Sequence, residues 1–458
     1  MRAAAPPKPI NSPSTPLAAP LMRATLPCNR APWRISDIVE PPGGYGRNSI
    51  TSPPLGLRGI MLARSAAVAL NSTLARRRIV QMPDYFTEVD VLRSGDSAGN
   101  GMTLRLTDGQ GRRIHTVAVP QEGYSHTGPT WAYIFENEGL TLIDPGAEVS
   151  FDLLKSGMAL GGLEVSDIER VIITHGHADH DGGVARVIEQ SDAELWAHDI
   201  YQPLLPFDPR DLQFMASSPI HQAMWETAKA NGFSPSNSEE RDRYMASRRT
   251  HQVGHHIAHG EQQGALTYMH APGHSPDEIC AVIENGPGDG MVFTGDHVLP
   301  EISPHPTMKT AFNGAVLNSL PVHYQDPDES FGLLTYLRSL QRVADLGSEV
   351  AVLPAHRLYN NHKFNFQTTQ RAGDLIRFHA RRLGRILVTA GPEPQPLEDV
   401  TRLTFERRKL EGGNFFAALT EVVAHIELLE DAGDMEVTDD HRLRRTGREN
   451  YQELLRTL

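Results

Sequence analysis

Short stretches in which apolar and polar residues alternate recur between about Asp84 and Thr369. Alternation with a period of two is typical of strands, whereas apolar residues three and four positions apart are typical of helices. Strands separated by helical stretches predict an α/β protein. The strands expected from this pattern are Met102–Leu106, Arg113–Val119, Trp131–Phe135, Leu140–Ile143, Val171–Ile173, Leu266–His270, Ile279–Ile283, Met291–Phe293 and Val350–Leu353.

Two longer stretches have the helical pattern instead. Residues Ser191–Gln262 are expected to be mostly helical, and so are residues 369–458, where Ala418–Leu429 carries apolar side chains at helical spacing. We therefore expect an α/β domain over residues 84–368, with a helical insert at about 200–260, followed by a helical C-terminal domain over 369–458.

Residues 1–80 show neither pattern, and their composition differs from that of the other residues. They hold eleven Lys and Arg and two Asp and Glu, a charge of +9, so the other 378 residues carry −22 of the total of −13. Twelve of the 33 prolines lie in the first 60 residues. We expect a disordered or loosely packed leader. An organelle transit peptide, or a start codon assigned too early with Met61 or Met82 as the alternatives, is left open.

The composition narrows the chemistry. Only Cys28 and Cys280 occur, which excludes a disulfide framework and a cysteine-rich zinc site. No stretch is apolar over a length that spans a bilayer, so we expect a cytoplasmic protein unless the leader directs it to an organelle. The net negative charge of the chain argues against nucleic-acid binding as its main function. The 21 histidines suggest that any metal is bound through imidazole and carboxylate.

A histidine cluster follows the strand expected at Val171–Ile173. Residues 174–181 read Thr-His-Gly-His-Ala-Asp-His-Asp. In extended backbone, residues two apart project to the same side, so His175 and His177 can contact one metal ion. Asp179 and His180 lie just beyond, where the chain turns, and can face a second ion. This set of ligands suits two zinc ions and also accepts manganese or iron.

Further residues of metal-binding type stand at the ends of three later strands. His274 follows Leu266–His270, Asp296 follows Met291–Phe293, and His356 follows Val350–Leu353. The ends of strands gather at one edge of a sheet, where α/β proteins form their sites. We expect these three residues to join the histidine cluster there.

The complete His-x-His-x-Asp-His pattern at 175–180, with the later ligand residues in this order, resembles the metallo-β-lactamase superfamily. The Leu-Ile-Asp-Pro-Gly stretch at 142–146 is similar to an element of the same family, and the resemblance covers roughly Gly128–His356. It implies a four-layer αββα sandwich with two metal sites. One ion would be held by His175, His177 and His274, the other by Asp179, His180 and His356, and Asp296 would bridge them.

The resemblance also implies the reaction. A hydroxide between the two ions would attack a carbonyl carbon that the ions polarise. Asp179 would be catalytic, because it could orient the hydroxide or relay a proton. We therefore expect a metal-dependent hydrolase whose small-molecule substrate is a thioester, a lactone or a carboxylic ester.

Two regions point to one branch of the family. The segments Ala271–Glu278 and Thr294–Asp296 resemble the glyoxalase II-like and β-lactamase-like-protein-2 branches. Phe378–Leu387 resembles the helix after the last metal ligand in the latter group, and Ala417–Arg445 resembles its C-terminal winged helix. The helical insert is a candidate homodimer surface.

Three alternatives to ester hydrolysis stay open. Some members of that group cut RNA, and this chain has basic residues that could contact phosphates, namely Arg381, Arg382, Arg385, Arg407, Arg408 and Lys409. A mononuclear iron oxygenase occurs in the same superfamily, although the complete second ligand set favours two ions. A non-enzymatic scaffold with a relic site is the third, and it fits poorly because every ligand position is filled.

A long, Pro-rich stretch, Glu301–Glu329, follows Asp296 directly. Loops over a site of this kind usually determine the choice of substrate. We expect Phe312, His323 and Tyr324 to line the substrate pocket.

Overall fold

The computed structural model describes residues 85–121, 127–208, 218–233, 239–286, 288–309, 314–411 and 414–458. The chain divides into two compact units, residues 1–59 and 60–458, and the described residues all belong to the second. The expected leader, residues 1–80, lies outside the described residues. None of the helices described is both long enough and apolar enough to cross a bilayer.

The first sheet has eight strands that are neighbours in chain order. Antiparallel pairs join the strands from β1 to β5, and parallel pairs join those from β5 to β8. The strands are β1 (Phe86–Arg93), β2 (Thr103–Asp108), β3 (Arg113–Val119), β4 (Thr130–Glu136), β5 (Leu140–Ile143), β6 (Arg170–Ile172), β7 (Glu194–His198) and β8 (His255–Ile257).

The second sheet has six strands in the order β16-β13-β12-β11-β10-β9. Its one parallel pair is β12 with β13, so the carboxyl ends of these two strands lie at the same edge of the sheet. The strands are β9 (Gln262–Gln263), β10 (Leu266–His270), β11 (Ile279–Gly286), β12 (Asp289–Gly295), β13 (Ala351–Pro354) and β16 (Gln367–Thr368), with a separate hairpin of β14 (Tyr359–Asn360) and β15 (Lys363–Phe364).

The period of two in these strands explains the sandwich. In β4, Tyr133 faces the core between the two sheets, whereas Ile134 packs against helices. In β12, Phe293 faces that same core and stacks on Phe135 with ring centroids 5.1 Å apart, whereas Val292 packs against helices on the other side. Each sheet is therefore apolar on both faces and is covered on both.

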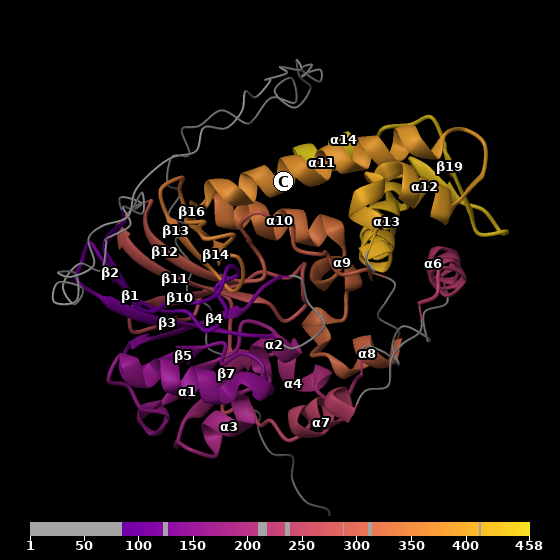
Figure 1. The fold of residues 1–458 in the computed structure, drawn as a ribbon. Coiled ribbons are helices and arrows are strands. Elements are labelled where there is room, and N and C mark those ends of the chain that lie inside the picture. The colour runs from indigo at the N-terminus through magenta and orange to yellow at the C-terminus, as the bar shows by residue number, and fades with distance from the viewer. Residues whose placement is uncertain are drawn as a thin grey trace, which may run out of the picture. The chain divides into compact units, whose positions relative to one another are not determined.

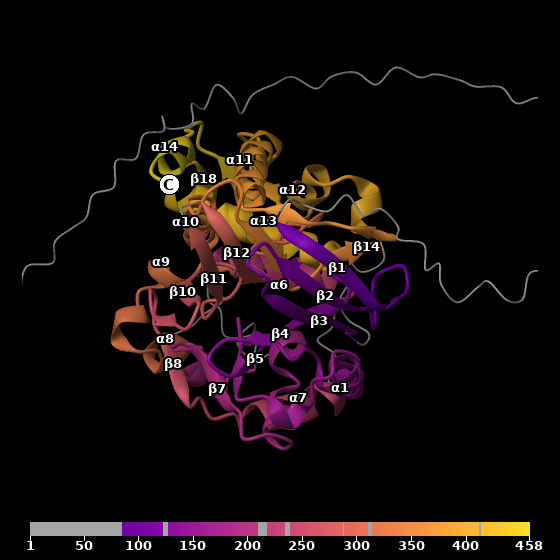
Figure 2. The same cartoon turned by 90° about the vertical axis from the view of Figure 1, so that its left-hand side faces the viewer.

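Helices form the two outer layers, as Figure 1 shows and Figure 2 repeats from the side. The first sheet is covered by α1 (Phe151–Leu160) and α3 (Val184–Ile188), and the second by α10 (Leu333–Ala344) and α11 (Gln370–Ala390). The expected four-layer αββα sandwich is thus confirmed. The other helices are α2 (Ala178–Asp181), α4 (Tyr201–Leu204), α6 (Pro219–Ala230), α7 (Glu239–Arg248), α8 (Gly314–Ser319), α9 (Pro327–Ser330), α12 (Leu397–Thr404), α13 (Asn414–Asp431) and α14 (Tyr451–Arg456).

The C-terminal part holds α11 to α14 and a small sheet in the order β17-β19-β18, from β17 (Gln395–Pro396), β18 (Met435–Val437) and β19 (Arg442–Arg445). Helix α13 and the insert helix α6 share one apolar core with the outer face of the second sheet. Ile220, Met224 and Trp225 of α6 belong to that core, so this part of the insert packs within the chain.

Several observed strands differ from the expected elements. Strands β1 and β14 to β16 were not expected, β7 to β9 lie within or at the end of the stretch Ser191–Gln262 that was expected to be mostly helical, and β17 to β19 interrupt the helical C-terminal part. Leu195–His198 of β7 are all buried, and the strand pairs with β6. A short buried parallel strand does not alternate, so its partner strand defines it rather than its own pattern.

Candidate metal centre

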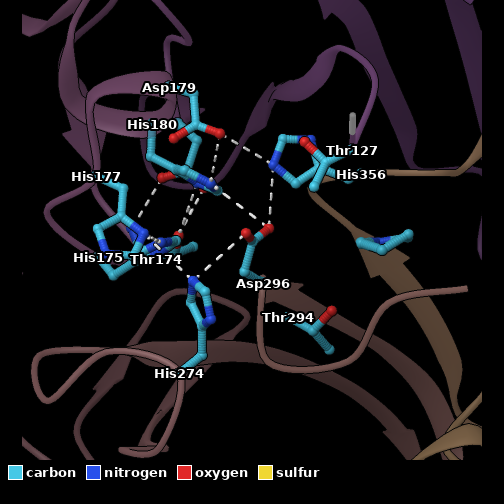
Figure 3. Close-up of polar contacts among 12 residues, drawn as sticks. Thr127, Thr174, His175, His177, Asp179, His180, His274, Thr294, Asp296 and His356 are labelled. Atoms are coloured by element: carbon cyan, nitrogen blue, oxygen red, sulfur yellow. Dashed lines mark hydrogen bonds and ion pairs between the residues drawn. The ribbon is translucent and has the colours of Figure 1, made fainter. Parts of the chain in front are cut away.

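The predicted ligand residues come from both sheets and meet at one edge of the sandwich (Figure 3). Beyond the end of β6, the chain carries His175 and His177 and then enters the single turn α2, which holds Asp179 and His180. His274 follows β10, Asp296 follows β12 and His356 follows β13. Strand ends from two sheets thus converge on one place.

Two groups of ligand atoms face each other at this edge. In the first, His177 Nδ1 lies 2.8 Å from His175 Nε2 and 3.3 Å from His274 Nε2. In the second, Asp179 Oδ2 lies 3.2 Å from His356 Nε2 and 3.8 Å from His180 Nε2. These groups are the two sets that the sequence suggests.

Asp296 lies between the two groups, as Figure 3 shows. Its Oδ2 is 3.6 Å from His274 Nε2 of the first group. Its Oδ1 is 3.5 Å from His180 Nε2 and 3.2 Å from His356 Nε2 of the second. One carboxylate therefore directs one oxygen to each set.

The atoms present fit divalent metal ions. Within each trio formed by His175, His177 and His274, or by Asp179, His180 and His356, the ligand atoms lie within 4.8 Å of one another. Nitrogen and oxygen ligands at about 2.0–2.2 Å from one ion stand at such separations. His180 Nε2 and Asp296 Oδ1 are buried and have no hydrogen-bond partner among the described residues. Both atoms point into the centre, where an ion would satisfy them.

Electrostatics keep these side chains in the forms that bind metal. Burial, reinforced by the neighbouring imidazoles, lowers the pKa of His175 well below its usual range, and burial lowers the pKa of His177 to about 3. Burial alone would raise the pKa of the Asp179 and Asp296 carboxyls, but the nearby imidazoles outweigh it and hold both pKa values below their usual range. His175 and His177 are therefore neutral imidazoles, and Asp179 and Asp296 are ionised carboxylates.

His180 behaves in the opposite way. Burial lowers its pKa, but the carboxylates of Asp144, Asp179 and Asp296 outweigh burial and raise the pKa of His180 well above its usual value. The same competition raises the pKa of His356. The potential at this second group therefore favours a positive charge, which a metal ion would supply.

Hydrogen bonds made by Nδ1 orient three of the imidazoles. His180 Nδ1 lies 2.8 Å from Asp144 Oδ2, His274 Nδ1 lies 2.9 Å from the His305 carbonyl oxygen, and His356 Nδ1 lies 3.0 Å from that of Pro129. Each acceptor keeps the proton on Nδ1 and leaves the Nε2 lone pair facing the centre. These partners were not predicted from the sequence. Asp144 was noted only as part of a motif, and backbone carbonyls leave no mark in a sequence.

The insert helix α7 also supports the ligand loop. Asp181, next to His180, accepts hydrogen bonds from Tyr201 Oη at 2.9 Å and from Tyr244 Oη at 2.8 Å, and Arg248 Nε lies 3.6 Å from it. Arg248 is buried and lies against Gly176, where an added Cβ would stand 2.8 Å from its Nη2. The contacts of α7 with Asp181 could not be predicted from the sequence, because they join residues more than 60 positions apart.

The structure groups two of the expected substrate residues with each other. Tyr324 Oη lies 3.1 Å from His198 Nε2, and the His323 and Tyr324 rings are 4.0 Å apart. The Tyr324 ring also contacts that of His270. These contacts lie beside the ends of β7 and β10, and a role in substrate binding stays a prediction. Phe312 lies outside the described residues.

A further group of metal-binding side chains connects α11 and α13. His379 Nδ1 lies 3.1 Å from His425 Nε2, and His425 Nδ1 donates to the Glu421 carbonyl oxygen at 2.7 Å. The Glu421 carboxylate forms an ion pair with Arg382. Since an arginine already pairs with this carboxylate and the two imidazoles bond to each other, we interpret the group as helix packing.

Comparison with known proteins agrees with this geometry. The family model of the metallo-beta-lactamase superfamily matches residues 127–356, half of the chain. The Bacillus subtilis (strain 168) protein named "Probable metallo-hydrolase YqjP" is 26% identical over 239 residues, which are 50% of this chain and 67% of that protein.

Two solved structures show the same fold. A beta-lactamase domain protein from Burkholderia ambifaria has a TM-score of 0.54 and 21% identity, over 78% of this chain and 98% of that one. A metallo-beta-lactamase family protein from Thermus thermophilus has a TM-score of 0.51 and 22% identity, over 72% and 98%. From the matched residues, the sandwich and the His and Asp groups at its edge, we conclude that this chain belongs to the metallo-β-lactamase superfamily of metallo-hydrolases.

Proposed function

We propose that the protein is a dinuclear metal-dependent hydrolase, with zinc in both sites, that cleaves a carbonyl ester: a thioester, a lactone or a carboxylic ester. The observation that carries the proposal is the position of Asp296, whose two oxygens face His274 on one side and His180 and His356 on the other. A carboxylate shared in this way suits two cations better than one.

Each residue has a defined task in this proposal. His175, His177 and His274 would hold the first ion, and Asp179, His180 and His356 would hold the second. Bound divalent ions polarise a carbonyl oxygen and lower the pKa of water enough to give a nucleophile at neutral pH. Asp179, whose side chain keeps 25% of its surface exposed, can accept the proton of the attacking water and deliver it to the leaving group.

Cys280, the cysteine of the described residues, is unsuited to nucleophilic attack. Cys280 is fully buried in the core on the outer face of the second sheet. Burial raises the pKa of its thiol well above the usual value, so the thiolate is not available near neutral pH. This supports water, rather than Cys280, as the nucleophile.

We also propose the β-lactamase-like-protein-2 branch with a C-terminal winged helix. The order α11, β17, α12, α13, β18, β19, with the three strands in one antiparallel sheet, supports this interpretation. Two of the six basic residues that could contact RNA form ion pairs with acidic residues, namely Arg382 with Glu421 and Arg408 with Glu406. This pairing favours an ester substrate over RNA.

The test is a panel of thioesters, lactones and aryl esters incubated with the zinc-reconstituted protein, with metal content measured on the same sample. We expect turnover of at least one ester class, about two zinc ions per chain, and loss of turnover in His177→Ala. Turnover of single-stranded RNA without ester hydrolysis would replace the proposal by the ribonuclease alternative. About one iron per chain together with oxygen uptake would replace it by the oxygenase.

A further inference from the structure

The metal ligand His274 depends on an irregular segment for its orientation. His274 Nδ1 must donate its proton to the His305 carbonyl oxygen, because a carbonyl can only accept. The backbone N–H and the side-chain hydroxyl of Thr307 both bond the Gly273 carbonyl oxygen, at 2.7 and 2.9 Å. The segment 299–309 therefore supports the loop that presents His274.

Residues 299–308 of that segment lie in no helix or strand, and the C-terminal helices satisfy several of its polar groups. From α11, Arg371 donates to the carbonyl oxygens of Leu299 and Ile302, both at 2.9 Å. From α13, Thr420 Oγ1 lies 2.8 Å from His305 Nε2, and Glu427 accepts from the Lys309 backbone N–H at 2.8 Å. Thr420 and Glu427 are seven residues, two helical turns, apart and thus lie on one face of α13.

The hydroxyl of Thr420 can serve His305 in either tautomer of its ring. Thr420 is buried, and its hydroxyl lies 3.0 Å from the carbonyl oxygen of Ala417 in its own helix. When Nε2 of His305 carries the proton, Thr420 Oγ1 accepts it and donates to Ala417; when Nδ1 carries the proton, Thr420 donates to Nε2. In both cases this bond joins α13 to the side chain of His305.

We propose that His305 and Thr420 are positioning residues for the metal ligand His274, so that helix α13 is part of the support of the metal centre. The bond from Thr420 fixes the His305 side chain, which fixes its backbone carbonyl, which in turn holds the His274 ring. The C-terminal helices therefore act on metal binding rather than only extending the fold. This inference rests on the proposed function in that His274 must hold an ion, and it does not depend on the substrate.

The test compares three threonine variants by competition of the protein with a chromophoric chelator for Zn²⁺. Thr420→Val keeps the shape and removes the hydroxyl, and Thr420→Ser keeps the hydroxyl. Thr404→Val is the matched control, because Thr404 is buried on α12 and its hydroxyl bonds the Val400 carbonyl of its own helix. We expect Thr420→Val to weaken Zn²⁺ binding about threefold to tenfold, less than loss of a direct partner. Thr420→Ser and Thr404→Val should bind as the unaltered chain does.

The visible spectrum of the Co²⁺-substituted protein is the second readout, since it responds to ligand geometry. It should change in Thr420→Val alone. Equal affinity and spectrum in all variants would overturn the proposal, and so would equal losses in Thr420→Val and Thr404→Val, or a Thr420→Ser variant that resembles Thr420→Val.

If Thr420→Val fails to fold, His305→Gln, which retains a donor, and His305→Leu, which does not, replace it. Only the leucine variant should lose affinity, and equal affinity would overturn the proposal. Absence of ester turnover would count against the proposed function and leave these affinities unaffected.

Discussion

Replacing Asp144 by asparagine tests how the metal centre is oriented. Asp144 is buried, and its carboxylate accepts three hydrogen bonds, from the Thr174 N–H at 2.8 Å, the Thr174 hydroxyl at 2.7 Å and His180 Nδ1 at 2.8 Å. The last two converge on one oxygen. An asparagine of the same shape must direct its NH₂ group at one of these donors, whichever way the amide is turned.

The two orientations of the amide have different costs. If the NH₂ group faces the Thr174 N–H, one buried donor is left unpaired, at a cost of about 1–3 kcal/mol in the free energy of unfolding. If it faces His180 Nδ1, that nitrogen must become an acceptor and the proton moves to Nε2, where it blocks the metal. Loss of such a partner typically lowers metal affinity about 10- to 100-fold, or about 1.4 to 2.8 kcal/mol.

Zn²⁺ affinity by chelator competition and the free energy of unfolding of the metal-free protein separate these effects. Asp434→Asn is the matched control, because Asp434 is equally buried and accepts the backbone N–H groups of Asn450 and Tyr451. It should lose stability but keep its metal affinity. An Asp144→Asn protein that keeps its zinc affinity within about twofold and also keeps the stability of the unaltered chain would refute the reasoning, because each orientation of the amide predicts one of the two losses.

Three further predictions concern stability. Phe293 is 1% exposed and stacks on Phe135, so Phe293→Ala should lower the free energy of unfolding, measured with denaturant, by about 3–5 kcal/mol. Leu403→Ala, at an exposed position, should change this free energy by less than about 0.5 kcal/mol. Comparable values for the two variants would contradict the packing between the sheets. Tyr244→Phe removes a hydrogen bond to the Asp181 carboxylate and should lower the free energy of unfolding by about 1.5–3 kcal/mol. Tyr268→Phe should not destabilise the protein, because the buried Tyr268 hydroxyl has no hydrogen-bond partner among the described residues. Equal effects of the two variants would show that α7 does not support the ligand loop through this bond. Burial lowers the pKa of His425 from 6.5 to about 3, so the unfolded chain takes up a proton at a higher pH than the folded one. Stability should therefore fall as the pH drops from 6.5 toward 3. The slope of the unfolding free energy against pH should be smaller in His425→Gln, and an unchanged slope would argue against a neutral His425.

Local spacing accounts for the part of the site that the sequence predicts. His175 and His177 are two apart in extended backbone, and Asp179 and His180 occupy the single turn that follows, so one short stretch brings both ligand groups within reach. Strand ends account for His274, Asp296 and His356, because apolar runs of period two mark where each strand stops. The fold class follows from the same pattern.

The tertiary structure alone decided the partners of these residues. Asp144, the carbonyl oxygens of Pro129 and His305, and the contacts of Tyr244 and Thr420 come from elements brought together by packing. Strands β7 and β8 were misassigned for the same reason, since a buried parallel strand is defined by the neighbour that satisfies its backbone. The sequence by itself determined which side chains can bind metal, because residue type and local spacing are properties of the sequence. Only the folded chain determined how they are oriented, because hydrogen-bond partners far apart in sequence depend on how the layers pack.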